Sequence, residues 1–170
     1  VPIMLSVTVT DRTGRTLSGQ TLEAFLASVQ HAPLFSVGLN CSFGARDMKP
    51  ALRTLAARAP YYISVYPNAG LPNSLGGYDQ TPEIMAEEMK DFIDEGLVNI
   101  IGGCCGTSPE YIKAVVEKYG RDVSVTVARR PEGIRYLTSE RMTLSFGLDG
   151  NFIIVGERIN PTGKKLLQAQ

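Results

Sequence analysis

The strongest constraint on the fold is a fourfold alternation of short apolar segments with amphipathic segments in the first 120 residues. The apolar segments begin near residues 3, 34, 61 and 98, so each strand–helix unit spans about 30 residues. Strands that alternate with helices at such a spacing pair in parallel through right-handed crossovers. The pattern therefore predicts an α/β fold, built either as an open doubly wound sheet or as part of a (β/α)₈ barrel.

The third and fourth amphipathic segments carry clear helix boundaries. Thr81 is suited to the N-cap of a helix that begins at Pro82, and Gly96 is suited to end it. Ser108 and Gly120 bracket the next helix in the same way. These boundaries predict two complete helices, each preceded by a short apolar strand.

Four units fill only half of a barrel, because eight units take roughly 250 residues. We therefore expect residues 1–120 to form a half-barrel, whose two outer strands would lack partners in isolation. Residues 121–151 combine a candidate strand at 123–127 with an irregular or hairpin-like stretch at 134–150, and we interpret them as a connector. Residues 152–170 open with an apolar segment, which we expect to be the first strand of a second domain.

Composition limits the partners and the compartment. Lysine plus arginine equals aspartate plus glutamate at 17 each, which argues against a nucleic-acid surface or a polybasic membrane patch. No apolar run approaches the roughly 18 residues of a membrane span, and the N-terminus lacks the features of a signal peptide. We therefore expect a cytoplasmic protein whose three cysteines are reduced.

All three cysteines follow predicted strands. Cys41 comes after the second strand, and Cys104 and Cys105 come after the fourth, within a glycine-rich stretch. Ligand sites lie at the carboxyl ends of parallel strands in both candidate architectures, so we expect the three thiols to share one face. Three thiolates suit Zn²⁺, with a fourth position left open as in catalytic zinc sites.

Two other interpretations of these residues stay open on the sequence alone. Free cysteine is often buried as a small hydrophobic side chain, which would make the three residues part of the core. A glycine-rich loop before a capped helix, here over 102–108, is also typical of phosphate binding at a helix N-terminus. The loop over 67–78 borders the same face, and it fits a functional loop and an ordinary surface loop equally well.

The motifs around the cysteines resemble those of a known family. Gly-Leu-Asn-Cys at 38–41, Pro-Asn-Ala-Gly at 67–70 and Gly-Gly-Cys-Cys-Gly-Thr at 102–107 are similar to motifs of the zinc-dependent homocysteine S-methyltransferases. Val-Gly-Glu-Arg-Ile-Asn at 155–160 resembles the entry to a pterin domain that binds methyltetrahydrofolate. The combination resembles the cobalamin-dependent methionine synthases more than the betaine- or S-methylmethionine-dependent members, which end after the first barrel.

The resemblance implies roles for individual residues. It makes residues 1–120 the C-terminal half of a homocysteine-binding (β/α)₈ barrel, with Cys41, Cys104 and Cys105 as the zinc ligands. Asn68 is then expected to fill the fourth zinc position until the substrate sulfur displaces it.

The resemblance also implies the chemistry and the partners. Zinc activates the thiol of homocysteine, which accepts a methyl group from methylcobalamin to give methionine, and 5-methyltetrahydrofolate regenerates the methylcobalamin. Glu157 and Asn160 match the pterin side of the family pattern. The other barrel half, the rest of the pterin domain and the cobalamin domain would belong to the same polypeptide, so we expect this chain to be inactive alone. The alternatives are a zinc-stabilised scaffold without catalysis and a homocysteine methyltransferase of the betaine- or S-methylmethionine-dependent type.

Overall fold

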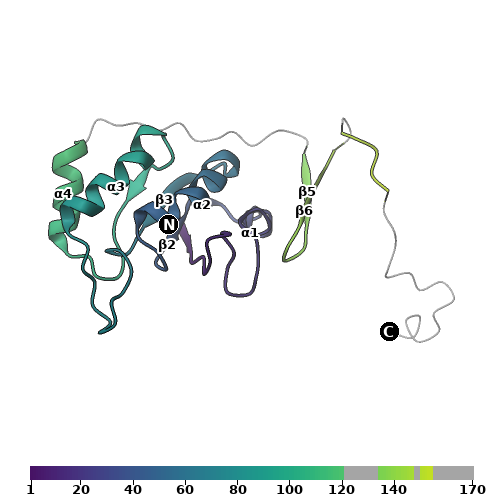
Figure 1. Ribbon diagram of the computed structural model, residues 1–170. Helices are drawn as coiled ribbons and strands as arrows, with labels where there is room; N and C mark the ends of the chain where they lie inside the picture. Colours follow the sequence, from purple (N-terminus) through teal and green to yellow (C-terminus); the bar gives the residue numbers. More distant parts are fainter. Residues whose placement is uncertain (121–133, 148–149, 155–170) are drawn as a thin grey trace.

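The computed structural model describes residues 1–120, 134–147 and 150–154 of the chain. Four strand–helix units form its main body (Figure 1). They comprise β1 (Ile3–Val7) and α1 (Leu22–Val29), β2 (Leu34–Asn40) and α2 (Ala45–Arg58), β3 (Tyr62–Tyr66) and α3 (Pro82–Asp94), and β4 (Ile100–Ile101) and α4 (Pro109–Tyr119). The strands make one parallel sheet in the order β1-β2-β3-β4, which confirms the predicted alternation.

Local capping chemistry sets the helix boundaries. The Thr81 hydroxyl accepts the Ile84 N–H at 3.4 Å, and Gly96 takes a positive φ of 63° directly after α3. Gly120 ends α4 with a φ of 68°, as predicted. Ser108 occupies the N-cap position of α4, but its hydroxyl donates to Glu110 instead of accepting a backbone N–H.

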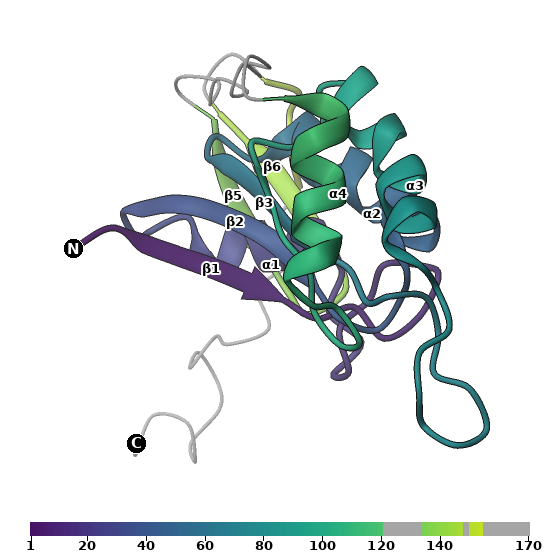
Figure 2. The same cartoon turned by 90° about the vertical axis from the view of Figure 1, so that its left-hand side faces the viewer.

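The apolar face of the sheet packs against the helices. Successive residues of a strand point to opposite faces, and in-register neighbours of parallel strands share a face. Figure 2 shows α2, α3 and α4 on one side of the sheet. Together with α1, they enclose a core that includes Val37, Leu39, Ile63 and Val65 from the strands and Leu52, Leu55, Met85, Met89 and Phe92 from the helices.

The opposite face of the sheet carries small and polar side chains. The register aligns Ser6, Gly38 and Ser64 across three strands on this face. Asn40 also lies there, where its side chain accepts from the Ser6 hydroxyl at 2.7 Å and donates to the Thr8 hydroxyl at 3.1 Å. Among the described residues, no helix packs on this polar face of the sheet (Figure 2).

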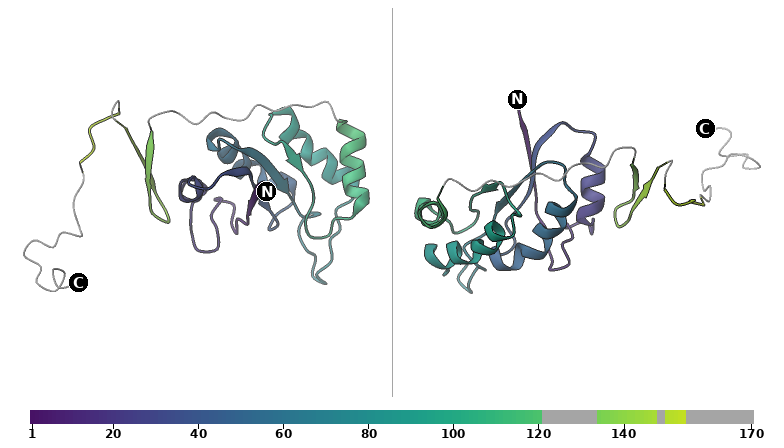
Figure 3. Two further views of the ribbon diagram at one scale, coloured as in Figure 1. Left: turned by 180° about the vertical axis from the view of Figure 1, so that it is seen from behind. Right: turned by 90° about the horizontal axis from the view of Figure 1, so that it is seen from above.

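A hairpin follows the four units. Its strands, β5 (Arg135–Thr138) and β6 (Thr143–Phe146), pair antiparallel, which confirms a hairpin within the stretch predicted as irregular or hairpin-like. The hairpin lies beyond α1, at the opposite end of the molecule from α4 (Figure 3). The Thr21 N–H donates to the Glu140 carbonyl at 3.1 Å and ties the hairpin to the start of α1.

The expected first strand of a second domain is not formed in the part that is described. Residues 152–154 adopt no strand, and the side chains of Phe152 and Ile154 are 93% and 86% exposed. A strand needs a neighbour for its backbone hydrogen bonds, and no described segment pairs with this one. Val155 and the candidate strand at 123–127 lie outside the described residues, and the proposed domain boundaries stay predictions. None of the described helices has the length and apolarity needed to cross a membrane.

Candidate metal centre

The structure brings the three cysteines together at the carboxyl edge of the sheet. Cys41 directly follows β2, and Cys104 and Cys105 follow β4 within the loop that leads to α4. Their Sγ atoms all lie within 4.8 Å of one another, although Cys41 is 63 residues from Cys104 in sequence. Among the described residues, no other group of three or more Cys, His, Asp or Glu side chains converges closely enough to hold a metal ion. The prediction that parallel pairing gathers these thiols on one face is therefore confirmed.

The end of β3 holds the two cysteine turns in place. The Cys41 N–H donates to the Tyr66 carbonyl at 3.0 Å on one side. On the other side, the Cys104 N–H donates to the Pro67 carbonyl at 2.8 Å. The middle strand thus acts as a template to which both flanking loops are hydrogen-bonded, and this fixes the separation of the sulfur atoms.

Asn68 and Ala69 continue this template at Cys105. The buried side chain of Asn68, which is 4% exposed, accepts the Cys105 N–H on Oδ1 at 3.1 Å. The Ala69 N–H donates to the Cys105 carbonyl at 2.9 Å. The backbone of Cys105 is therefore held on both its donor and its acceptor side by the start of the loop over 67–78.

Two left-handed backbone turns aim the thiols. Cys41 and Ser42 have φ values of 56° and 64°, which non-glycine residues adopt only at a cost in conformational energy. On the opposite side, Gly106 has a φ of 77° directly after Cys105. The strain at Cys41 has no signal in the sequence, because a glycine would be the usual residue there. Strained backbone of this kind is concentrated at functional sites.

Two of the three thiols that we expected to be reduced are paired in the structure. The structure contains a disulfide between Cys41 and Cys104, with their Cα atoms 5.7 Å apart, and Cys105 is a free, exposed thiol. That Cα separation suits a disulfide, and the strand-end positions that gather three thiols for a metal equally bring two of them within bonding reach. A metal centre of three thiolates therefore requires the reduced form of this pair.

Two of the three sulfur–sulfur distances match the geometry of tetrahedral zinc. Tetrahedral zinc with Zn–S bonds of about 2.3 Å separates its thiolates by about 3.8 Å. The Sγ atom of Cys105 lies 3.9 Å from both the Cys41 Sγ and the Cys104 Sγ. The donor set is all sulfur, which zinc prefers over hard-cation alternatives. The residues fit a zinc ion once Cys41 and Cys104 are reduced.

The two alternative interpretations of this region fit the structure less well. Cys105 is exposed and the other two cysteines are half-buried, so the cluster is not part of the hydrophobic core. In the glycine-rich loop, the N–H groups of Gly102, Cys104 and Thr107 donate to backbone carbonyls, and that of Cys105 donates to Asn68. With those four donors engaged inside the protein, the loop is poorly prepared to hold a phosphate.

The remaining predicted site residues do not join the cluster. Glu157 and Asn160 lie outside the described residues, so their assignment to a pterin site stays a prediction. His31, the single histidine, follows α1 and places Nδ1 3.0 Å from the Ser28 carbonyl oxygen. It lies before β2, whereas the cysteines follow the carboxyl ends of strands, so it is not a candidate ligand.

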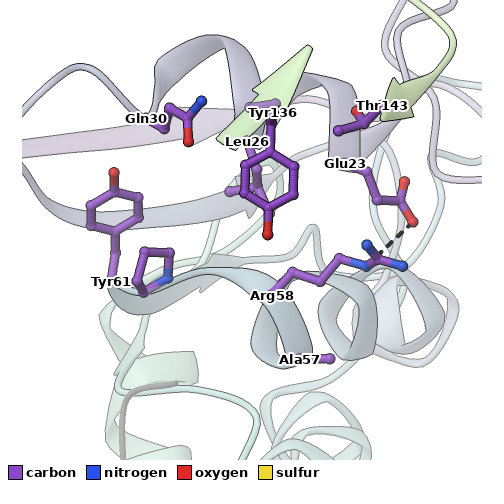
Figure 4. A pocket seen from close by; sticks show the side chains of 10 residues that line it. Glu23, Leu26, Gln30, Ala57, Arg58, Tyr61, Tyr136 and Thr143 are labelled. Carbon is purple, nitrogen blue, oxygen red and sulfur yellow. Dashed lines mark ion pairs between the residues drawn. The ribbon is translucent and has the colours of Figure 1, made fainter. Parts of the chain in front are cut away.

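A separate cavity of about 180 Å³ lies between the hairpin and the helices (Figure 4). Tyr61 and Tyr136 line it together with an ion pair between Glu23 and Arg58, whose nitrogen and oxygen atoms are 3.7 Å apart. None of the cysteines is among its lining residues. The candidate metal centre is therefore a surface feature of the strand ends and not part of this cavity.

The chain therefore has an α/β fold with a candidate thiolate metal centre, formed by three cysteines at the carboxyl ends of its parallel strands. The model of the homocysteine S-methyltransferase family matches residues 1–119, and the chain belongs to that family. Among solved structures, it is similar to the metallated form of the homocysteine methyltransferase MmuM from Escherichia coli. The two are 26% identical, the match covers 69% of this chain and 36% of that one, and the TM-score is 0.47. This chain thus corresponds to little more than a third of that relative's length.

Proposed function

We propose that Cys41, Cys104 and Cys105 in their reduced form hold a zinc ion that activates the thiol of homocysteine for methylation. The observation that carries the proposal is the convergence of three Sγ atoms within 4.8 Å, two pairs of them at 3.9 Å. Family membership supplies the substrate class and the reaction. The proposed activity is that of a homocysteine S-methyltransferase whose product is methionine.

The charge of the donor set explains why three thiolates suit this reaction. A free thiol has a pKa of about 8.5, so little of it is ionised at neutral pH. Zinc, when bound, stabilises the thiolate form of homocysteine and thereby supplies the nucleophile. Three cysteine thiolates carry more negative charge than the ion neutralises, and this keeps the substrate sulfur electron-rich. That sulfur forms the bond to the methyl carbon, and the donor keeps the electron pair of the bond that breaks.

Asn68 is the proposed occupant of the fourth position before substrate arrives. Its Oδ1 atom accepts the Cys105 N–H, which brings an amide oxygen next to one of the cysteine turns. This amide oxygen would supply the fourth ligand to a bound zinc ion until the substrate sulfur displaces it.

We further propose that residues 1–120 are the C-terminal half of a (β/α)₈ barrel. Within the described residues, β1 and β4 each have a strand partner on one side only. Next to β4, a cavity of about 240 Å³ is bordered by Ile101 and by the exposed side chains of Ile112 and Val116. Open strand edges beside exposed apolar side chains are what a missing neighbouring unit would cover.

The proposed methyl donor is methylcobalamin, regenerated from 5-methyltetrahydrofolate by further domains of the same polypeptide. This branch of the family is favoured by the sequence at 155–160, and donors such as betaine or S-methylmethionine are the second candidate. Because the other barrel half and these domains are needed, the 170-residue chain alone should transfer no methyl group from methylcobalamin to homocysteine. Measurable methionine formation by the chain alone would overturn this part of the proposal.

X-ray absorption at the zinc edge tests the activation of homocysteine. In the reduced, zinc-loaded chain, the ion should have three sulfur ligands and one oxygen or nitrogen ligand. The test is then repeated on a longer protein that contains both halves of the barrel. Addition of homocysteine to that protein should raise the number of sulfur ligands from three to four. A count that stays at three in the complete barrel would favour a zinc-stabilised scaffold without catalysis.

A further inference from the structure

The cavity between the hairpin and the helices adjoins a second cavity. The first, of about 180 Å³, is drawn in Figure 4 and is called the inner cavity below; the second, of about 270 Å³, is called the outer cavity. Both are lined by the same four residues from α1, α2 and the hairpin: Glu23, Arg58, Tyr136 and Thr143. Because the two cavities share these walls, one ligand can extend across both.

The inner cavity offers apolar and aromatic surface. Its aliphatic walls come from the two helices and the turn after α2, and they are Leu26, Ala27, Ala57 and Pro60. Tyr61 and Tyr136 add aromatic side chains, and Tyr136 reaches in from the hairpin (Figure 4). Burial of a small ring against such walls is favourable. The inner cavity is therefore suited to the apolar part of a ligand.

The outer cavity is polar and carries a net positive charge. Its charged lining residues are Arg58 and Arg141 on the one hand and Glu23 on the other. Thr143 and Ser145 of the hairpin add hydroxyl groups to the same lining. Two guanidinium groups beside one carboxylate leave one positive charge without compensation in the cavity, so an anion would complement it.

The two guanidinium groups have donors to offer an anion. Arg58 Nε lies 3.7 Å from Glu23 Oε1, which is longer than a hydrogen bond. Within the described ranges of the chain, no hydrogen bond uses a side-chain donor of Arg58 or Arg141. A guanidinium carries five N–H donors in a planar fork that matches the oxygens of a carboxylate or a phosphate.

We propose that the two cavities together bind one small organic anion, whose carboxylate or phosphate group pairs with Arg58 and Arg141 and whose ring lies in the inner cavity beside Tyr61 and Tyr136. None of the three cysteines lines either cavity, so this site is separate from the candidate metal centre. The ligand contacts the hairpin on one side and α1 and α2 on the other. Its binding would therefore fasten the predicted connector at 121–151 to the helices.

Four probes test the class of ligand by titration calorimetry. Benzoate and phenyl phosphate carry a ring and an anionic group, whereas inorganic phosphate lacks the ring and benzyl alcohol lacks the charge. The two aromatic anions should bind at one site per chain, and the tighter of them identifies the anionic group. The other two probes should bind at least about tenfold more weakly, because each fills only one cavity.

Charge variants test the position of the anion. Arg58→Gln and Arg141→Gln should each weaken the binding of the aromatic anions about tenfold, the size of one hydrogen bond to a charged group. Glu23→Gln should strengthen it, because this change removes a like charge and releases Arg58. Arg135→Gln is the matched control, since Arg135 lies on β5 but on the face opposite to Tyr136, and it lines neither cavity.

Hydrogen exchange shows whether the ligand fastens the hairpin. The Thr21 N–H donates to the Glu140 carbonyl of the hairpin, so its exchange rate reports how well the hairpin stays docked. Bound benzoate or phenyl phosphate should slow this exchange in the unsubstituted chain. An unchanged exchange rate at saturating anion, no saturable binding of either aromatic anion, or equal affinity for benzyl alcohol or inorganic phosphate would overturn the inference. So would a loss of affinity in Arg135→Gln that equals the loss in Arg58→Gln and Arg141→Gln.

Discussion

The side-chain oxygen of Asn68 accepts the backbone N–H of Cys105 at 3.1 Å, across two loops that are far apart in sequence. The contact joins the end of β3 to the turn that follows β4. It is made by a buried amide, and the Ala69 N–H on the next residue holds the Cys105 carbonyl. Asn68 therefore supports the geometry of the candidate metal centre through this hydrogen bond, independently of any contact with the metal.

Replacement of Asn68 should expose this dependence. Asn68→Ala leaves the Cys105 N–H without its acceptor, and loss of such an outer partner typically lowers metal affinity by about tenfold or more. Asn68→Asp keeps an oxygen acceptor at the same place and should bind zinc nearly as the unsubstituted chain does. Competition with a chromophoric chelator measures both affinities. Equal affinities for Asn68→Ala and the unsubstituted chain would show that the contact does not support the centre.

Gly106 should be far less tolerant of a side chain than Gly76. Both have a similar positive φ, 77° and 79°, so alanine imposes a comparable backbone strain of about 1–2 kcal/mol at each. A Cβ at Gly76 meets nothing within 4 Å, whereas one at Gly106 overlaps the Tyr78 ring. Gly106→Ala should therefore lose more stability in denaturant titration and should also weaken zinc binding. Matching losses in the two variants would mean that the ring does not pack on the turn.

Oxidation should abolish metal binding. In the oxidised chain, Cys41 and Cys104 are joined and Cys105 is a free cysteine, so one reactive thiol per chain is expected. Reduction should give three thiols and restore stoichiometric zinc. Thiol titration and metal analysis on the same samples check the two numbers together. Full zinc content in a chain with one free thiol would contradict the three-thiolate centre.

The ion pairs between α2 and α3 should make stability depend on pH. Arg53 donates twice to Glu95 at 2.7 Å, and Lys49 lies 2.8 Å from the same carboxylate. These cations lower the pKa of Glu95 from 4.5 to about 2, so their contribution is present above pH 4.5 and is lost as the pH falls toward 2.

Glu95→Gln should accordingly melt at a lower temperature than the unsubstituted chain at neutral pH, and the difference should shrink below pH 4.5. Glu117→Gln is the control, because Glu117 forms a single longer contact of 3.6 Å with Lys113 on an exposed helix surface. Thermal unfolding across this pH range checks both variants. A difference for Glu95→Gln that stays constant with pH would contradict the assignment.

Much of the fold follows from local chemistry and is visible in the sequence. The boundary signals at Thr81, Gly96 and Gly120 act within one helical turn, and the structure has each of them in the predicted role. Ser108 differs because its hydroxyl has a nearer partner in Glu110. The apolar segment at 152–154 differs because strand formation needs a partner strand, which hydrophobicity alone does not supply.

The residues of the site could be predicted from the sequence, but the contacts that hold them in place could not. The convergence of Cys41 with Cys104 and Cys105 follows from parallel pairing, since strand ends meet at one edge. The positive φ at Cys41 and the contact of Tyr78 with Gly106 are tertiary, and nothing in a local pattern indicates them. The disulfide between two of the three cysteines was also unexpected, because strand-end proximity favours both a metal and a sulfur–sulfur bond.

Metal analysis of three reduced proteins tests the central claim most directly. The unsubstituted chain should bind one zinc ion, and Cys104→Ser should lose stoichiometric zinc. His31→Ala should keep the ion, because the single histidine lies outside the cysteine cluster. Circular dichroism on the same samples shows whether Cys104→Ser keeps its fold. One zinc ion in the unsubstituted and His31→Ala chains, lost only in a folded Cys104→Ser chain, is the result that we predict. Stoichiometric zinc in Cys104→Ser would contradict a metal centre built from these three thiolates.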